Sequence, residues 1–187
     1  VLYGEGAAID TKGTPYLTET FDSANVYTIK GVFAAMPMRY NIHADYLEFK
    51  NKEVIYILDP ALNIKRVDFK EYSFVVEKSE AGGKMKLGFF VLLDSGNVSL
   101  LAKKNISYRD AQPAKAMQEA TPATYSKQKD EYFFKIGSGQ LIEISSVKRM
   151  IEEFPNKHDE LEQFVRKEKI SKNEEDLVKL VRYYNSL

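Results

Sequence analysis

His43 and Asp45 are the residues whose types and spacing could most readily do chemistry. An imidazole two positions from a carboxylate could act as a general base that the carboxylate orients, or the pair could supply two ligands to a metal ion. The chain has two histidines, and the second, His158, lies far along the sequence in a polar segment. A site that used both rings would require the C-terminal part of the chain to dock beside His43.

The segment around His43 also accounts for these residues without any ligand. Its apolar residues occupy even positions before the histidine and odd positions after it. They are Tyr40, Ile42, Leu47 and Phe49. Side chains alternate between the two faces of a strand, so an unbroken strand cannot place both pairs on one face. We therefore predict a turn or bulge at residues 43–45, in which Asp45 accepts hydrogen bonds from backbone amides beyond it.

No familiar catalytic or ligand-binding motif occurs elsewhere in the sequence. Gly-Ser-Gly at residues 137–139 joins two apparent strands and lacks the outer spacing of a nucleophile elbow. The glycines of residues 4–13 lack the preceding strand and following helix of a phosphate-binding loop. Residues 94–97 are too short for a calcium loop. We predict no catalytic, cofactor-binding or metal-binding residue. The alternative is a hydrolase whose carboxylates and His43 meet only in the fold.

The composition narrows the classes of function further. Lys plus Arg and Asp plus Glu each total 27, so no net charge favours nucleic-acid binding. The absence of cysteine excludes disulfides, thiolate metal sites and cysteine nucleophiles within this chain. No apolar run approaches the ~20 residues of a membrane-spanning helix. The first residue is valine, as removal of an export signal would leave, and we expect an exported protein.

Residues 26–108 have the pattern of antiparallel β-structure, with short aromatic and β-branched stretches between turns. One predicted hairpin has Asn51 and Lys52 at its tip, and a second turns at residues 94–97. A near copy of the second turns at residues 137–139. Pro37 predicts a sheet edge or a break, because proline cannot donate to a ladder.

After Ile144 the apolar period changes from two to 3.6, which predicts three short helices. Their apolar stripes are Val147, Met150, Ile151 and Phe154; Leu161, Phe164 and Val165; and Leu177, Leu180, Val181 and Tyr184. Ser145 or Ser146 is expected to cap the first helix and Asn156 the second. Ser171 and Glu174 are expected to form a capping box for the third.

The predicted fold class is α+β, mostly antiparallel β, with a C-terminal helical cap of two or three helices. Residues 1–144 form the β domain, as a curved sheet, sandwich or open barrel, with a long loop at residues 109–130. Residues 145–187 form a cap packed on it within one globular unit. The loop is expected to be flexible, with a turn or two of helix in residues 114–120.

Two segments resemble a group of uncharacterised secreted proteins of Bacteroidetes-type bacteria, which have no assigned activity. The first is a Tyr-Asn-Ile strand followed by an Asp/Leu/Glu segment, and the second is a charged double-helix tail that ends near Tyr-Tyr-Asn. The matching residues are Tyr40, Asn41, Ile42, Leu47, Glu48, Tyr183, Tyr184 and Asn185. The resemblance covers most of the chain and implies export to the periplasm or the outer membrane. It supplies no catalytic residue.

These observations favour a non-catalytic exported envelope protein that acts as a binding or interaction module for a protein or glycan. The expected contact surface is a sheet edge near Pro37 or the segment from Arg109 to Asp130. Tyrosines beside polar partners are the aromatic candidates for contact. They are Tyr16, Tyr27, Tyr40, Tyr108 and Tyr125. A further alternative is a carrier that holds a small apolar ligand inside a β-barrel.

Overall fold

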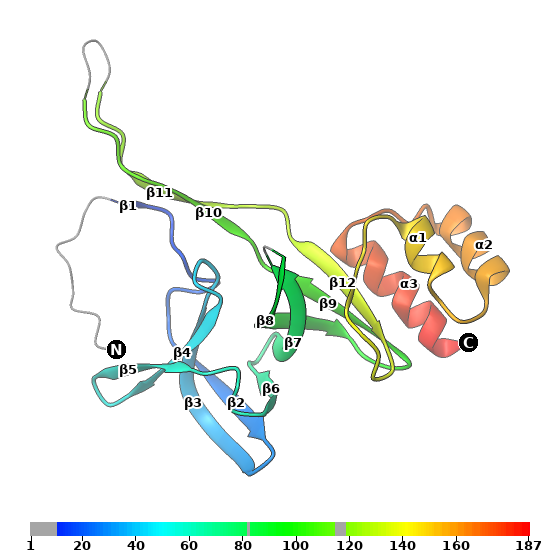
Figure 1. The fold of residues 1–187 in the computed structure, drawn as a ribbon, viewed down its shortest axis with the longest axis horizontal. Helices are drawn as coiled ribbons and strands as arrows, with labels where there is room; N and C mark the ends of the chain where they lie inside the picture. Colours follow the sequence, from blue (N-terminus) through cyan, green and yellow to red (C-terminus); the bar gives the residue numbers. More distant parts are fainter. Residues whose placement is uncertain (1–10, 82, 115–118) are drawn as a thin grey trace.

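The computed structural model describes residues 11–81, 83–114 and 119–187. In these ranges the chain forms a curled antiparallel sheet, a small second sheet and three C-terminal helices (Figure 1). The predicted α+β class, mostly antiparallel β with a helical cap, is therefore confirmed.

The larger sheet has ten strands and curls into a half-barrel. Its strand order is β13-β12-β9-β8-β7-β6-β2-β3-β4-β5, and neighbouring strands are antiparallel. The strands are β2 Asp22–Thr28, β3 Gly31–Asn41, β4 Tyr46–Asn51, β5 Val54–Leu58, β6 Ile64–Asp68, β7 Ser73–Ala81, β8 Lys84–Asp94, β9 Val98–Lys103, β12 Glu131–Ile136 and β13 Ile142–Glu143.

The predicted hairpins are β4–β5, β8–β9 and β12–β13. Strand β9 pairs with β12, so the two similar hairpins lie side by side in the sheet. The β3–β4 ladder begins at Met38, directly after Pro37. On its β4 side, Pro37 therefore has no paired strand. This is an edge position, where the missing N–H of proline costs no ladder hydrogen bond.

The small sheet has the order β1-β11-β10, with bounds β1 Thr11–Lys12, β10 Ile106–Arg109 and β11 Ala123–Lys127. Gln112 and Thr121 form a further bridge, so β10 and β11 continue as a ribbon that projects from the body (Figure 1). Within the predicted loop at residues 109–130, residues 123–127 form β11 and Gln112 bridges Thr121, so part of this polar segment is paired across the ribbon. The helix expected at residues 114–120 falls largely on residues 115–118, outside the described ranges.

The buried apolar side chains form one cluster of half-barrel residues, a second between the sheet and the helices, and a third, small one around Phe90. Large buried side chains of the half-barrel include Tyr40, Phe74 and Phe89. Helices α1 Val147–Glu152, α2 His158–Glu168 and α3 Glu174–Ser186 bury their stripes against Phe134 and Leu100 of β12 and β9. Paired residues such as Phe134 and Leu100 share a face of the sheet, which gives the helices their surface.

Helix starts agree only in part with the sequence. Ser146 caps α1 by accepting a hydrogen bond from the Arg149 N–H, as predicted. The α2 prediction was wrong: Lys157 holds the N-cap position, with no side-chain cap. The Asn156 side chain instead accepts a hydrogen bond from the Tyr184 hydroxyl at 3.3 Å. The Asn156 side chain therefore contacts α3 instead of capping α2.

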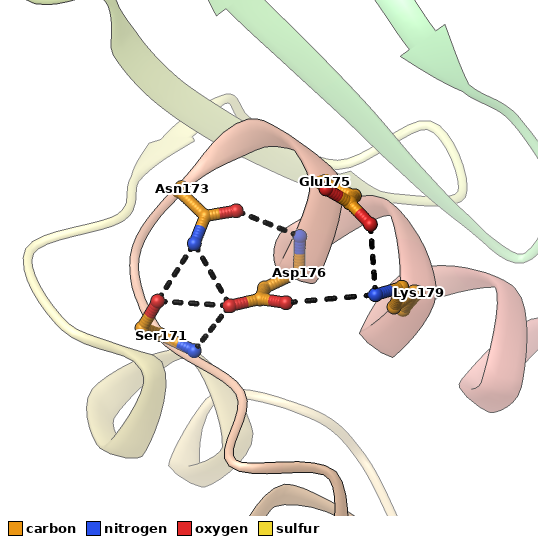
Figure 2. Close-up of polar contacts among 5 residues, drawn as sticks. All are labelled: Ser171, Asn173, Glu175, Asp176 and Lys179. Atoms are coloured by element: carbon orange, nitrogen blue, oxygen red, sulfur yellow. Dashed lines mark hydrogen bonds and ion pairs between the residues drawn. The ribbon is translucent and has the colours of Figure 1, made fainter.

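The N-cap of α3 is Asn173, two residues after the predicted Ser171 (Figure 2). Its side-chain oxygen accepts a hydrogen bond from the Asp176 N–H at 2.9 Å. The Asp176 carboxylate in turn accepts hydrogen bonds from Ser171 and Asn173. These bonds, those from Ser171 first, hold the pKa of Asp176 below its ordinary value. Ser171 therefore supports the cap but does not begin the helix.

Replacing Asn173 with alanine is expected to lower the free energy of unfolding by about 1 kcal/mol, because α3 loses an N-cap acceptor. Urea unfolding followed by circular dichroism measures the change. Lys172→Ala, at the adjacent exposed position, serves as the control. Equal losses in the two variants would contradict this assignment of the cap.

Candidate functional site

The turn that contains His43 and Asp45 is the predicted bend. Residues 42–45 connect β3 to β4, and Tyr40 pairs with Leu47 across the hairpin. The bend therefore returns the apolar residues of both strands to one face. The Asn41 side chain accepts a hydrogen bond from the Ala44 N–H, so Asn41 rather than Asp45 caps the turn.

Asp45 reaches across the half-barrel instead of bonding to its own turn. Its Oδ1 atom accepts a hydrogen bond from the Tyr40 hydroxyl at 2.7 Å and lies 3.4 Å from the Phe89 backbone nitrogen. Its Oδ2 atom forms an ion pair with Lys103, whose Nζ donates to the Phe89 carbonyl at 3.0 Å. We name these residues, Tyr40, Asp45, Phe89 and Lys103, the Asp45 cluster. It joins the β3–β4 turn to β8 and β9.

The Asp45 cluster meets the side of β8 that faces away from β7, at a point beyond the β8–β9 ladder. The β8–β9 ladder covers Val91 to Asp94, so the outward N–H and C=O groups of Phe89 lie beyond it. Asp45 and Lys103 supply the missing partners, as buried backbone groups require. A β-carbon on Gly88 would lie 2.7 Å from Asp45 Oδ2 and 2.9 Å from Lys103 Nζ. The close approach of both charged groups therefore needs a glycine here.

Burial perturbs the protonation of this cluster. Desolvation lowers the pKa of Lys103, while the neighbouring Asp45 carboxylate partly opposes that shift. Burial raises the pKa of Tyr40, and Asp45 adds to the rise. A perturbed lysine beside an aspartate is a pattern found at active sites. In this cluster, however, both charged groups are bonded to each other and to the backbone, which is the arrangement of a structural ion pair.

His43 lies on the exposed side of the turn and contacts the root of the ribbon. Its ring centroid is 5.8 Å from Tyr108 and 5.4 Å from Tyr125, and the two tyrosine rings are 4.8 Å apart. Tyr108 and Tyr125 face each other across β10 and β11. We name these three residues the aromatic cluster. It fixes the ribbon to the β3–β4 turn and leaves Tyr108 42% exposed.

The two histidines belong to different parts of the molecule. His158 begins α2 at the helical end, whereas the turn of His43 adjoins β4 in the other half (Figure 1). The His158 ring lies 2.7 Å from the carbonyl oxygen of Phe154. Within the described ranges, no group of three or more His, Cys, Asp or Glu side chains could hold a metal ion.

No protein-family model, curated protein or solved structure matches this chain. In the part of the chain that the structure describes, no helix is long and apolar enough to cross a membrane.

A buried ion pair between Arg39 and Glu48 is a feature that sequence reasoning missed. Arg39 Nε lies 2.7 Å from Glu48 Oε2, with side-chain exposures of 16% and 7%. The guanidinium also donates to the Tyr16 hydroxyl and lies over the rings of Tyr16 and Phe21, 3.7 and 4.4 Å from their centroids. The opposed positions of Arg39 and Glu48 in the β3–β4 ladder are the signal that could have found it.

The candidate tyrosines thus have different roles. Burial, with a further contribution from Glu48, raises the pKa of Tyr16, which packs on the buried arginine. Tyr27 lies under the Arg66 guanidinium, 4.9 Å from ring centroid to Cζ. Tyr40 is fully buried. Only Tyr108 and Tyr125 combine partial exposure with a place at the projecting ribbon.

Aromatic side chains pack together in the core of the half-barrel, the region that a carrier would need open for its ligand. Tyr40, Phe69, Tyr72 and Phe74 contact one another there at ring-centroid distances between 4.6 and 5.9 Å. A groove of about 660 Å³ lies elsewhere, between the β7–β8 hairpin and the β12–β13 turn. Glutamates 77, 80 and 143 are part of its lining, so it is not the apolar interior that the carrier alternative requires.

Proposed function

We propose that this protein is a non-catalytic binding module of the bacterial cell envelope and that the β10–β11 ribbon is its contact surface. The observation that best supports the proposal is the ribbon's projection from the body (Figure 1). Residues 107–114 of the ribbon are all exposed. An ordered polar segment that buries little of its own surface is typical of segments that contact partners.

The root of the ribbon is held more firmly than an ordinary loop. The aromatic cluster packs one side of it, and β1 pairs with β11 in parallel on another. A segment whose direction is already fixed loses less conformational entropy when it binds. This supports a role in recognition rather than a role as a passive linker between β9 and β12.

The partner that we propose is a protein of the envelope. Exposed rings at the root, those of His43 and Tyr108, supply flat apolar surface beside polar strand residues, which is the composition of many protein interfaces. A glycan is the other class of partner that such rings suit. The location is supported by the resemblance to secreted proteins, and fractionation of cells that express the complete gene tests it directly.

In vivo photo-crosslinking tests the ribbon. A photo-reactive amino acid replaces Arg109 on β10 or, as the control, Lys148 on α1, whose side chain is 85% exposed. We expect a discrete crosslinked protein from the ribbon position and none from the helix. The same protein should be absent when residues 111–122 are replaced by Asn-Gly, which keeps β10 and β11 intact.

Two results would overturn the ribbon proposal. One is equal crosslinking from positions 109 and 148, which would indicate non-specific proximity. The other is a crosslinked protein that persists undiminished, from another ribbon position such as Ser107, after the ribbon is shortened. Circular dichroism of the purified variants confirms that the body remains folded.

A further inference from the structure

Strand β5 is an edge strand with apolar side chains exposed on both faces. Among the described residues it is the last strand of the larger sheet, with β4 as its one neighbour. Val54, Ile55, Tyr56 and Ile57 are 39%, 47%, 45% and 46% exposed. Alternate side chains point to opposite faces, so over residues 54–57 both faces of the strand are left exposed by the part of the chain that the structure describes.

The usual devices that protect a sheet edge are missing from β5. Natural edge strands carry prolines, charged side chains or bulges, or are very short. From Val54 to Leu58 there is no proline and no charge, and the β4–β5 register is regular throughout. The opposite edge of the same sheet, β13, has two residues. An unprotected apolar edge of this kind is a template for an added strand.

The hairpin geometry identifies the backbone groups that an added strand would meet. Asn51 pairs with Val54 across a two-residue turn. In such a turn the N–H and C=O groups of the closing pair point toward each other, between the two strands. Val54, Tyr56 and Leu58 therefore bond toward β4. Ile55 and Ile57 direct their N–H and C=O groups outward, to the unpaired side.

Acidic residues bracket these outward groups. Glu53 precedes the strand and Asp59 follows it, and both are exposed. Both lie at odd positions, as Ile55 and Ile57 do. The Glu53 side chain is 93% exposed, so water screens its ion pair with Lys50 at 3.4 Å and the carboxylate stays accessible. A strand added along β5 would thus run from one carboxylate to the other, with apolar positions between them.

We propose that β5 binds, by strand addition, an extended apolar segment of a partner protein that has lysine or arginine at both ends. We choose a partner with basic ends because its charges complement those of Glu53 and Asp59. A second copy, paired about Tyr56, would set Glu53 of each chain against Asp59 of the other, which like charges disfavour. A seam of five residues is also small beside the ~1,200 Å² of a stable dimer.

This surface is separate from the ribbon, so the two proposals fail independently. Crosslinking at the ribbon does not depend on the β5 edge, and peptide binding at β5 does not depend on residues 111–122. The ribbon-shortened variant should therefore bind the peptide described below as well as the unaltered chain does.

Fluorescence anisotropy with a labelled synthetic heptapeptide tests the proposal. The peptide alternates valine and threonine and has a lysine at each end, and its matched control has glutamates at the ends. We expect saturable binding of the lysine peptide and roughly fivefold weaker binding of the glutamate peptide, because two exposed charge pairs change sign. Glu53→Lys combined with Asp59→Asn should remove or reverse this preference. Asparagine can retain the side-chain acceptor that bonds to the Ala61 N–H.

A second probe leaves the protein unchanged. N-methylation of the two peptide residues that face Ile55 and Ile57 removes the donors that strand addition requires, and we expect binding to be lost. Equal binding of the lysine and glutamate peptides, or binding that survives N-methylation, would overturn the proposal. Absence of peptide binding would also overturn the proposal. This includes the case in which sedimentation shows dimers of the chain and Ile55→Lys dissociates them.

Discussion

Replacing Glu48 with glutamine is expected to lower the free energy of unfolding by about 3 kcal/mol, because it leaves the Arg39 guanidinium without its counter-ion in a buried position. The size of the effect follows from the 7% exposure of the Glu48 side chain and the 16% exposure of Arg39. Glutamine keeps the length of the side chain, so loss of charge rather than a cavity dominates. Urea unfolding at neutral pH measures the difference.

The matched control for this prediction lies in the same hairpin. Glu53 forms an ion pair with Lys50 at 3.4 Å, but its side chain is 93% exposed. Glu53→Gln should therefore leave the stability unchanged, because water screens an exposed pair. If the two glutamine variants proved equally stable, the buried pair would have no special role in holding β3 to β4.

Replacing Asp45 with asparagine is expected to cost about 2 kcal/mol, less than for Glu48 because the Asp45 side chain is 34% exposed. Asparagine tolerates the φ of 55° at this position and can still accept hydrogen bonds from Tyr40 and Phe89. It cannot neutralise Lys103. The loss of stability therefore measures the contribution of the Asp45–Lys103 ion pair, which joins the β3–β4 turn to β9.

Asp59→Asn provides the comparison for Asp45→Asn. Asp59 also lies in a turn and bonds through its side chain to a backbone N–H, that of Ala61, but it is exposed. This variant should unfold at the same urea concentration as the unaltered chain. A comparable loss in both variants would mean that any turn aspartate, rather than the contact with Lys103, accounts for the destabilisation.

Local patterns in the sequence predicted most of the fold. The parity change between Tyr40 and Leu47 correctly indicated a bend, because alternation in a strand is a local property. The helical stripes, such as Leu177 with Leu180 and Val181, marked the faces that are buried. Turn residues likewise located the hairpins. These features depend on neighbours within a few positions.

The features that sequence reasoning missed depend on distant partners. Asp45 was expected to bond within its own turn, but it meets Phe89 and Lys103 because the sheet curls and brings β4 near β8. The polar segment after Arg109 read as a loop, since its cross-strand partners carry little apolar alternation. The edge position of β5 follows from strand order, which no local pattern encodes.

Asp45, the most reactive-looking residue of the bend, joins the β3–β4 turn to β8 and β9 through its ion pair with Lys103 and its hydrogen bonds. A double-mutant cycle measures this directly, with Asp45→Asn, Lys103→Met and both changes together, each unfolded in urea. We expect a coupling of about 2 kcal/mol between Asp45 and Lys103, with the double variant more stable than Asp45→Asn alone. A coupling near zero, with the two losses simply additive, would contradict it.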